Sequence, residues 1–214
     1  MNPDLEKIIS HITTPKREIF TQIFLVFITP ILLIKLNILS IQYRIPVLIA
    51  LVVLLMVILI REKWTWEMLG FSKKHIKHYL APYAMFTFLG VAFIVFTHEI
   101  AGFSIAHTWW QQKHFLYMFL ILSFLQEVAY RGYLMPALGK ITNNPYWIIG
   151  LNTVLFTFLH IIYPNLAVGI PVALVGGLGF SLMYYKYPNL PLITISHSVL
   201  NFCAVLYGFF VISH

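Results

Sequence analysis

Long apolar runs are the feature that most limits how this chain can fold. About seven mostly apolar stretches of roughly 17 to 23 residues recur along the 214-residue sequence, and each is long enough to cross a bilayer as a helix. These runs lie at about 20–40, 44–61, 80–98, 115–137, 146–162, 166–185 and 190–212. The sequence therefore predicts an all-α, polytopic membrane bundle of about seven transmembrane helices.

Composition and charge exclude the soluble classes. Hydrophobic residues make up 60% of the chain and charged residues only 10%, whereas a soluble domain is about a quarter charged. The net charge of +7 comes from Lys and Arg in short connections, as topology determinants require, so we expect membrane lipid and not nucleic acid as a partner. The single cysteine, Cys203, excludes an intrachain disulfide and a Cys-based zinc site.

The domain organisation follows from where the polar residues lie. Residues 1–19 form a polar N-terminal segment, and residues 20–214 form one transmembrane domain. No cleavable signal peptide is evident, because the first apolar run is too long for one. Asn-Pro and Pro-Asn pairs predict helix boundaries near residues 144, 164 and 188. Residues 64–71 and the lysines that follow predict an interfacial amphipathic helix.

Three titratable side chains fall inside the later apolar runs. Glu127 lies midway through the fourth run, and His160 and His197 lie in the fifth and seventh. A carboxylate at bilayer depth is costly unless it is paired or faces a wet cavity, so its default interpretation is functional. The other acidic residues lie at the N-terminus, in a connection or at the end of a run: Asp4, Glu6, Glu18, Glu62, Glu67 and Glu99.

The spacing of the neighbouring polar residues adds to this set. Glu127 and Arg131 are four residues apart and share a helical face, although such a pair also fits a structural ion pair. His197 and Asn201 are one turn apart, and alone they fit hydrogen bonding between helices equally well. Together with His160 the groups supply a base, a partner to orient it and oxyanion donors, which is a set suited to hydrolysis.

Three ordered motifs in the second half of the chain resemble those of the CPBP intramembrane proteases. They read Gln126-Glu127-x-x-x-Arg131, Phe156-x-x-x-His160 and His197-x-x-x-Asn201. This family includes the CAAX prenyl endoprotease and the bacteriocin-processing and immunity (Abi) proteins, and the resemblance covers a protease core at about residues 115–205. It implies a helical membrane bundle with a polar cavity and an intramembrane endopeptidase without a covalent intermediate.

The resemblance also implies a role for each residue. The acid of the first motif and His160 activate water, Arg131 orients the acid, and His197 and Asn201 form the oxyanion hole. The family usually has two glutamates where this chain has Gln126-Glu127, and an amide is not basic near neutral pH. Glu127 then acts as the base with a hydrogen bond from Gln126, or the protein is a pseudoprotease, or Gln126 is an engineered change. We take the first interpretation, because every other motif residue is retained.

Other classes of function remain open. A zinc protease would use Glu127, His160 and His197 as ligands, whereas our preferred interpretation needs no cofactor. A membrane scaffold or bacteriocin immunity protein would follow from the loss of the first glutamate. A transporter or proton relay fits least, because no inverted repeat is present. We expect a peptide or lipidated protein as substrate, and the short chain favours a multi-pass protein of a bacterial inner membrane.

Overall fold

Helices make up nearly all of the described chain. The computed structural model describes residues 2–71, 75–102, 105, 114–162 and 165–209, and within these residues it contains helices and no strands. The all-α class is therefore confirmed. In chain order the elements are α1 (Pro3–His11), α2 (Lys16–Ile23), η1 (Phe24–Ile28), α3 (Thr29–Lys35), η2 (Ile41–Tyr43), α4 (Arg44–Arg61), α5 (Ile76–Ala101), α6 (His114–Glu127), η4 (Val128–Leu134), α7 (Met135–Ile141), α8 (Pro145–Leu159), η5 (His160–Ile162), α9 (Leu166–Lys186) and α10 (Leu190–Leu206).

Four helical segments of the described chain are long and apolar enough to cross a membrane: Lys16–Lys35, Ile76–Ile100, Pro145–Ile162 and Leu166–Lys186. They correspond to the first, third, fifth and sixth predicted runs. The second and seventh runs form shorter apolar helices, Pro46–Arg61 and Leu190–Leu206, and residues 210–212 of the seventh lie outside the described residues. The fourth run is divided among α6, η4 and α7. The structure thus supports an integral membrane protein with four candidate spans, and the count of seven stays a prediction.

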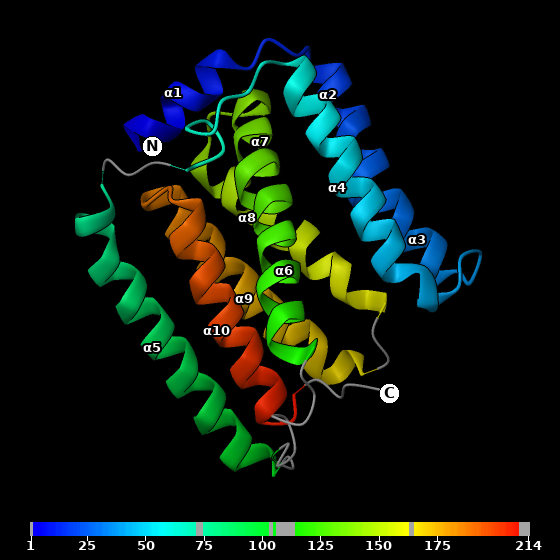
Figure 1. Cartoon of the computed structure of the whole chain (residues 1–214), viewed down its shortest axis with the longest axis vertical. Coiled ribbons are helices and arrows are strands. Elements are labelled where there is room, and N and C mark those ends of the chain that lie inside the picture. The colour runs from blue at the N-terminus through cyan, green and yellow to red at the C-terminus, as the bar shows by residue number, and fades with distance from the viewer. Residues whose placement is uncertain (1, 72–74, 103–104, 106–113, 163–164, 210–214) are drawn as a thin grey trace.

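The arrangement of the helices brings the three motifs together. In Figure 1 the α6–α7 rod runs through the middle, with α10 and then α5 on one side and the α2–α3 and α4 pair on the other. Helix α8 packs on α9, while α10 contacts α6 and α5. The first motif lies on α6 and η4, the second on α8 and η5, and the third on α10. Segments far apart in sequence therefore meet around the centre of the bundle.

Asparagine and proline residues begin the helices of the second half as the sequence predicts. The Asn144 side chain accepts a hydrogen bond from the N–H of Tyr146, directly before α8 (Pro145–Leu159). Asn189 accepts one in the same way from Leu192 at the start of α10. Such caps satisfy N–H groups that have no partner within the helix, and a proline in the first turn has no N–H to satisfy.

The N-terminal segment is more closely attached to the bundle than its polar composition predicts. Asn2 caps α1, which buries Leu5 and Ile8 and contacts α7. The first membrane-length helix then begins at Lys16 rather than near residue 20. Apolar residues spaced three apart on α1 give this short helix a buried face, which explains why a mostly polar segment packs against the protein.

Residues 64–71 do not form the interfacial helix that the sequence predicts, and residues 72–74 of that prediction lie outside the described residues. The segment consists of turns, and Gly70 has a left-handed φ of 86°. Leu69 is buried, and Gly70 accepts a hydrogen bond from the N–H of Leu190 at 2.9 Å. The segment therefore packs on the start of α10, and a continuous helix would break these contacts.

Candidate active site

The first motif lies where the central rod changes its helical form. Glu127 is the last residue of α6, and the π-helical stretch η4 follows directly, with all seven of its residues buried. The N–H of Met135 donates to the carbonyl of Tyr130, which is the five-residue spacing of a π-helix. Short π-helical segments are frequent at functional sites because they change the direction of side chains relative to a regular helix. The local geometry thus sets how Arg131 meets Glu127.

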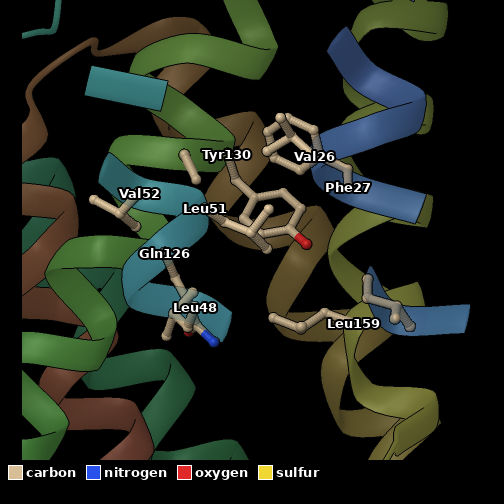
Figure 2. Close-up of a pocket in the computed structure, with 10 residues that line it drawn as sticks. Val26, Phe27, Leu48, Leu51, Val52, Gln126, Tyr130 and Leu159 are labelled. Atoms are coloured by element: carbon tan, nitrogen blue, oxygen red, sulfur yellow. The ribbon is translucent and has the colours of Figure 1, made fainter. Parts of the chain in front are cut away.

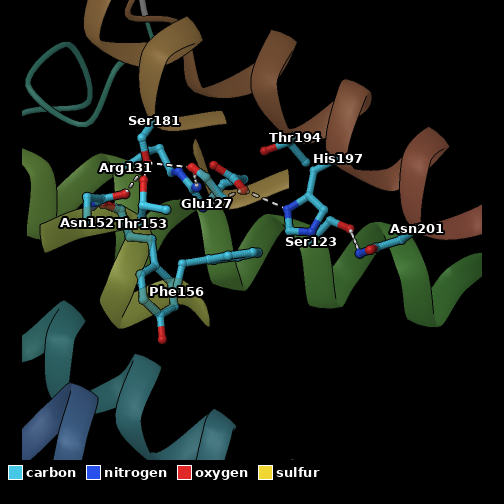
Figure 3. Close-up of polar contacts among 12 residues, drawn as sticks. Ser123, Glu127, Arg131, Asn152, Thr153, Phe156, Ser181, Thr194, His197 and Asn201 are labelled. Carbon is cyan, nitrogen blue, oxygen red and sulfur yellow. Dashed lines mark hydrogen bonds and ion pairs between the residues drawn. The ribbon is translucent and has the colours of Figure 1, made fainter. Parts of the chain in front are cut away.

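Glu127, Arg131 and His197 form a closed cluster in the core. Glu127 Oε1 accepts a hydrogen bond from Arg131 Nη1 at 3.1 Å and from His197 Nδ1 at 2.6 Å (Figure 3). The exposed fractions of the three residues are 0%, 0% and 2%. The pairing of Glu127 with Arg131 that the spacing predicts is therefore present. Because a carboxylate oxygen accepts, His197 presents Nδ1–H to it and turns Nε2 away.

The guanidinium of Arg131 is held by a carbonyl and by aromatic rings as well as by the acid. Its Nη2 donates to the carbonyl of Gly177 on α9 at 3.3 Å. Its central carbon lies 4.6 Å from the ring centroid of Phe156 and 5.4 Å from that of Phe180. Cation–π contacts of this kind stabilise a charge that has left water. The two phenylalanines also seal the cluster.

Some polar atoms of the cluster are buried without a partner. Within the described residues, Glu127 Oε2, Arg131 Nε and Thr194 Oγ1 have no hydrogen-bond partner. Thr194 lies one turn before His197 on α10, and Figure 3 shows both side chains on the side of that helix that faces Glu127. An unsatisfied buried acceptor is costly, particularly a charged one. Oε2 is therefore the atom of the cluster that is available to take a proton or a donor.

His160 joins the cluster through Phe156. Its Nδ1 lies 3.0 Å from the carbonyl of Phe156, one turn earlier, and a carbonyl can only accept. Nδ1 therefore carries the proton, and in the neutral ring Nε2 has the basic lone pair. The Phe156 ring lies 5.1 Å from the ring of His160 and 5.7 Å from that of His197. The two imidazoles predicted for the site thus flank one aromatic ring.

Asn201 contacts the helix that carries the acid. Its Nδ2 donates to the hydroxyl of Ser123 at 3.2 Å, and Ser123 is fully buried one turn before Glu127 on α6 (Figure 3). The carboxamide is thereby fixed beside the first motif. It lies on the same helix as His197 and one turn further on.

Gln126 points away from the buried cluster. It lines a cavity of about 50 Å³ together with Tyr130 and Leu159, as Figure 2 shows. The remaining walls come from Ala129 of η4 and from apolar side chains of the α2–α3 segment and α4, namely Val26, Phe27, Ile31, Leu48, Leu51 and Val52. The sequence predicts one polar cavity, but this structure separates the charged groups from the open space. The charged groups are buried among aromatic rings, and the cavity beside them is mostly apolar.

Sequence reasoning missed several polar residues around the cluster. Asn152, Ser181 and Ser123 are fully buried, and Thr194 is nearly so. One signal was present: Asn152, Phe156 and His160 are spaced four apart, so Asn152 extends the face of the second motif by one turn. The serines and Thr194 carry no comparable pattern, since hydroxyl side chains are common in apolar helices.

The described part of the chain contains no group of three His, Cys, Asp or Glu side chains placed to share a metal ion. Glu127 uses Oε1 for Arg131 and His197, and His160 directs Nδ1 to a backbone carbonyl. A zinc site formed by Glu127, His160 and His197 therefore stays a prediction, and metal analysis of the purified protein would test it.

Comparison with known proteins agrees with the motifs. Residues 106–203, just under half of the chain, match the family model described as type II CAAX prenyl endopeptidase Rce1-like. No curated protein and no solved structure matches the chain. The matched range contains all three motifs and the buried cluster. It confirms the predicted resemblance to the CPBP/CAAX protease family and supports a membrane protease of the CAAX type.

Proposed function

We propose that this protein is an intramembrane endopeptidase. It hydrolyses a peptide bond of a membrane-associated or lipidated peptide or protein by means of an activated water molecule. The observation that carries the proposal is the buried carboxylate of Glu127, which two cationic or donor groups hold by one oxygen while the other oxygen has no partner in the described chain. A multi-pass location in a bacterial inner membrane is part of this proposal.

Water activation is the step for which the cluster is best suited. Glu127 Oε2 accepts the proton of the water, and the ion pair with Arg131 fixes the orientation of the carboxyl group. His160 assists through Nε2, because its Nδ1 proton is used by the carbonyl of Phe156. The water oxygen then attacks the peptide carbonyl, and the proton passes to the leaving amine as the C–N bond breaks. Because water is the nucleophile, no covalent enzyme intermediate forms.

The third motif, with His197 and Asn201, stabilises the oxyanion. His197 gives Nδ1–H to Glu127, so it donates to an oxyanion through Nε2 only when the ring carries two protons. Asn201 supplies an N–H donor from the next turn of α10 when its amide turns from Ser123 to the substrate.

The test is a cleavage assay on purified protein in proteoliposomes. The reporters are membrane-anchored fluorogenic peptides, with and without a C-terminal prenyl-cysteine. We expect Glu127→Gln and His160→Ala each to lower kcat by ~10²- to 10⁴-fold, the range for loss of a general base. Glu99→Gln and His78→Ala change the same residue types at exposed positions outside the motifs and should leave kcat unchanged.

A non-catalytic role is the second candidate, and Gln126 favours it. The side chain at the position of the usual first glutamate cannot act as a base, and it lies in a mostly apolar cavity. A pseudoprotease acting as a membrane scaffold or bacteriocin immunity protein would show no difference among the wild type, Glu127→Gln and His160→Ala with any reporter. That result would overturn the proposed protease activity.

A further inference from the structure

A second buried polar cluster lies next to the guanidinium of Arg131. It consists of Asn152 on α8 and Ser181 on α9, both fully buried (Figure 3), and of the carbonyl of Gly177 on α9. None of these groups belongs to the three motifs. A buried polar network far from water is costly unless its members are satisfied, so its position and partners require an explanation.

Asn152 holds the backbone of the π-helical stretch. Its Nδ2 donates to the carbonyl of Tyr130 at 2.6 Å, and that carbonyl also accepts the N–H of Met135 in the π-helical pattern. Tyr130 directly precedes Arg131 in the chain. The amide of Asn152 therefore fixes the peptide unit from which the Arg131 side chain departs.

Ser181 bonds the carbonyl group that accepts from the guanidinium of the same arginine. Its hydroxyl lies 2.9 Å from Asn152 Oδ1 and 2.7 Å from the carbonyl of Gly177, and its single proton is shared between these acceptors. The carbonyl of Gly177 is also the acceptor of Arg131 Nη2 at 3.3 Å. The contacts form a closed loop that begins at the backbone before Arg131 and returns to its guanidinium.

We infer that Asn152 is a positioning residue for the reaction. Together with Ser181 it fixes the π-helical register and the position of the Arg131 guanidinium. Arg131 in turn orients the carboxylate of Glu127. A hydrogen-bonded pair that only fastened α8 to α9 would not need to bond the carbonyl of Tyr130, which directly precedes Arg131. Nor would it need to bond the carbonyl of Gly177, which accepts from the Arg131 guanidinium. The kinetic consequence rests on the proposed peptidase function, whereas the structural consequence does not.

The test compares Asn152→Leu with Thr157→Val. Thr157 lies on the same helix and is buried, and within the described residues its hydroxyl donates to the backbone carbonyl of Thr153, so its variant removes a buried polar group outside the loop. With the membrane-anchored reporter we expect Asn152→Leu to lower kcat by ~10- to 100-fold with KM within about twofold, because small misplacements of a catalytic group are costly. Thr157→Val should retain the wild-type kcat.

Hydrogen–deuterium exchange of the same variants in micelles gives a readout that does not depend on cleavage. Loss of one hydrogen bond predicts about fivefold faster exchange at residues 128–135 in Asn152→Leu, and no change there in Thr157→Val. Wild-type exchange at residues 128–135 in Asn152→Leu overturns the inference whether or not the protein cleaves peptides. An unchanged kcat in an active Asn152→Leu overturns it as well. Failure of the wild type to cleave any reporter would overturn the proposed function instead, and the exchange data would still decide the role of Asn152.

Discussion

Replacing Arg131 by Met tests whether the buried ion pair is energetically coupled. Arg131 Nη1 and Glu127 Oε1 lie 3.1 Å apart, and both side chains are fully buried. With an effective dielectric constant of about 20, two unit charges at that separation attract by roughly 5 kcal/mol. Removing one partner of such a pair leaves a buried charge without compensation, and typical losses are about 3–5 kcal/mol. We therefore expect Arg131→Met to lower the free energy of unfolding by about 3–5 kcal/mol.

A double-mutant cycle separates this coupling from lost packing. Arg131→Met, Glu127→Gln and the double variant are unfolded reversibly in mixed micelles by increasing the fraction of denaturing detergent, and helicity is followed by circular dichroism. Because the double variant removes both charges, its loss of stability should be smaller than the sum of the single losses by about 3 kcal/mol or more. The guanidinium also contacts Phe156 and Phe180, so part of each single loss belongs to packing and cancels in the cycle.

Arg61 provides the matched control. It lies exposed at the end of α4, so Arg61→Met should change the unfolding free energy by no more than about 0.5 kcal/mol. If the effects of Arg131→Met and Glu127→Gln add within about 0.5 kcal/mol, the two residues are not coupled, and the assignment of Arg131 as the group that orients the acid is wrong.

The remaining predictions concern packing, the oxyanion and metal dependence. A Cβ at Gly177 would lie 2.9 Å from Phe156 Cδ1, so Gly177→Ala should destabilise the protein by about 1–3 kcal/mol in the same detergent titration. A Cβ at Gly150 would meet no atom of the described residues within 4 Å, so Gly150→Ala should be neutral, or stabilising by up to about 1 kcal/mol. Asn201→Ala should retain residual cleavage, with kcat reduced by ~10²- to 10³-fold as for a lost oxyanion donor. Prolonged chelation should leave cleavage intact, and loss of activity that zinc restores would favour the metalloprotease.

The fold class and the pairing within the first motif could be predicted from the sequence for simple physical reasons. Apolar runs of membrane length leave few structures other than helices, because backbone groups in lipid must find partners within the same segment. The four-residue spacing of Glu127 and Arg131 needs only a helix to bring them together. Asparagine caps beside prolines mark helix starts through strictly local hydrogen bonds, which explains why Asn144 and Asn189 were found.

Features that depend on tertiary packing could not be predicted. The contact of His197 with Glu127 joins residues on α10 and α6, and nothing in the local pattern indicates which of the two candidate histidines approaches the acid. The π-helical stretch at residues 128–134 likewise receives a hydrogen bond from Asn152 on another helix. Residues 64–71 carry an amphipathic pattern, but buried contacts of Leu69 and the left-handed backbone of Gly70 override it.

The last prediction concerns Gln126 and follows from the division of the site. Glu127 is sealed in the core, whereas Gln126, its neighbour in sequence, lines the cavity, since adjacent residues of a helix point about 100° apart. A cavity of about 50 Å³ exceeds the roughly 10–15 Å³ that one water molecule requires. A carboxylate at position 126 would therefore lie where it can hold water, while Glu127 reaches water only when the aromatic seal opens.

Gln126→Glu should accordingly raise kcat in the reporter assay by about tenfold or more. For comparison, a general base typically contributes at least ~10²-fold to the rate. Gln126→Met fills the same space without hydrogen bonds and serves as the control, because it shows what the amide itself contributes. The increase should depend on Glu127, so adding Glu127→Gln to Gln126→Glu should remove most of the gain. An unchanged kcat in Gln126→Glu, with wild-type stability, would show that Glu127 acts alone and that the cavity does not contain the attacking water.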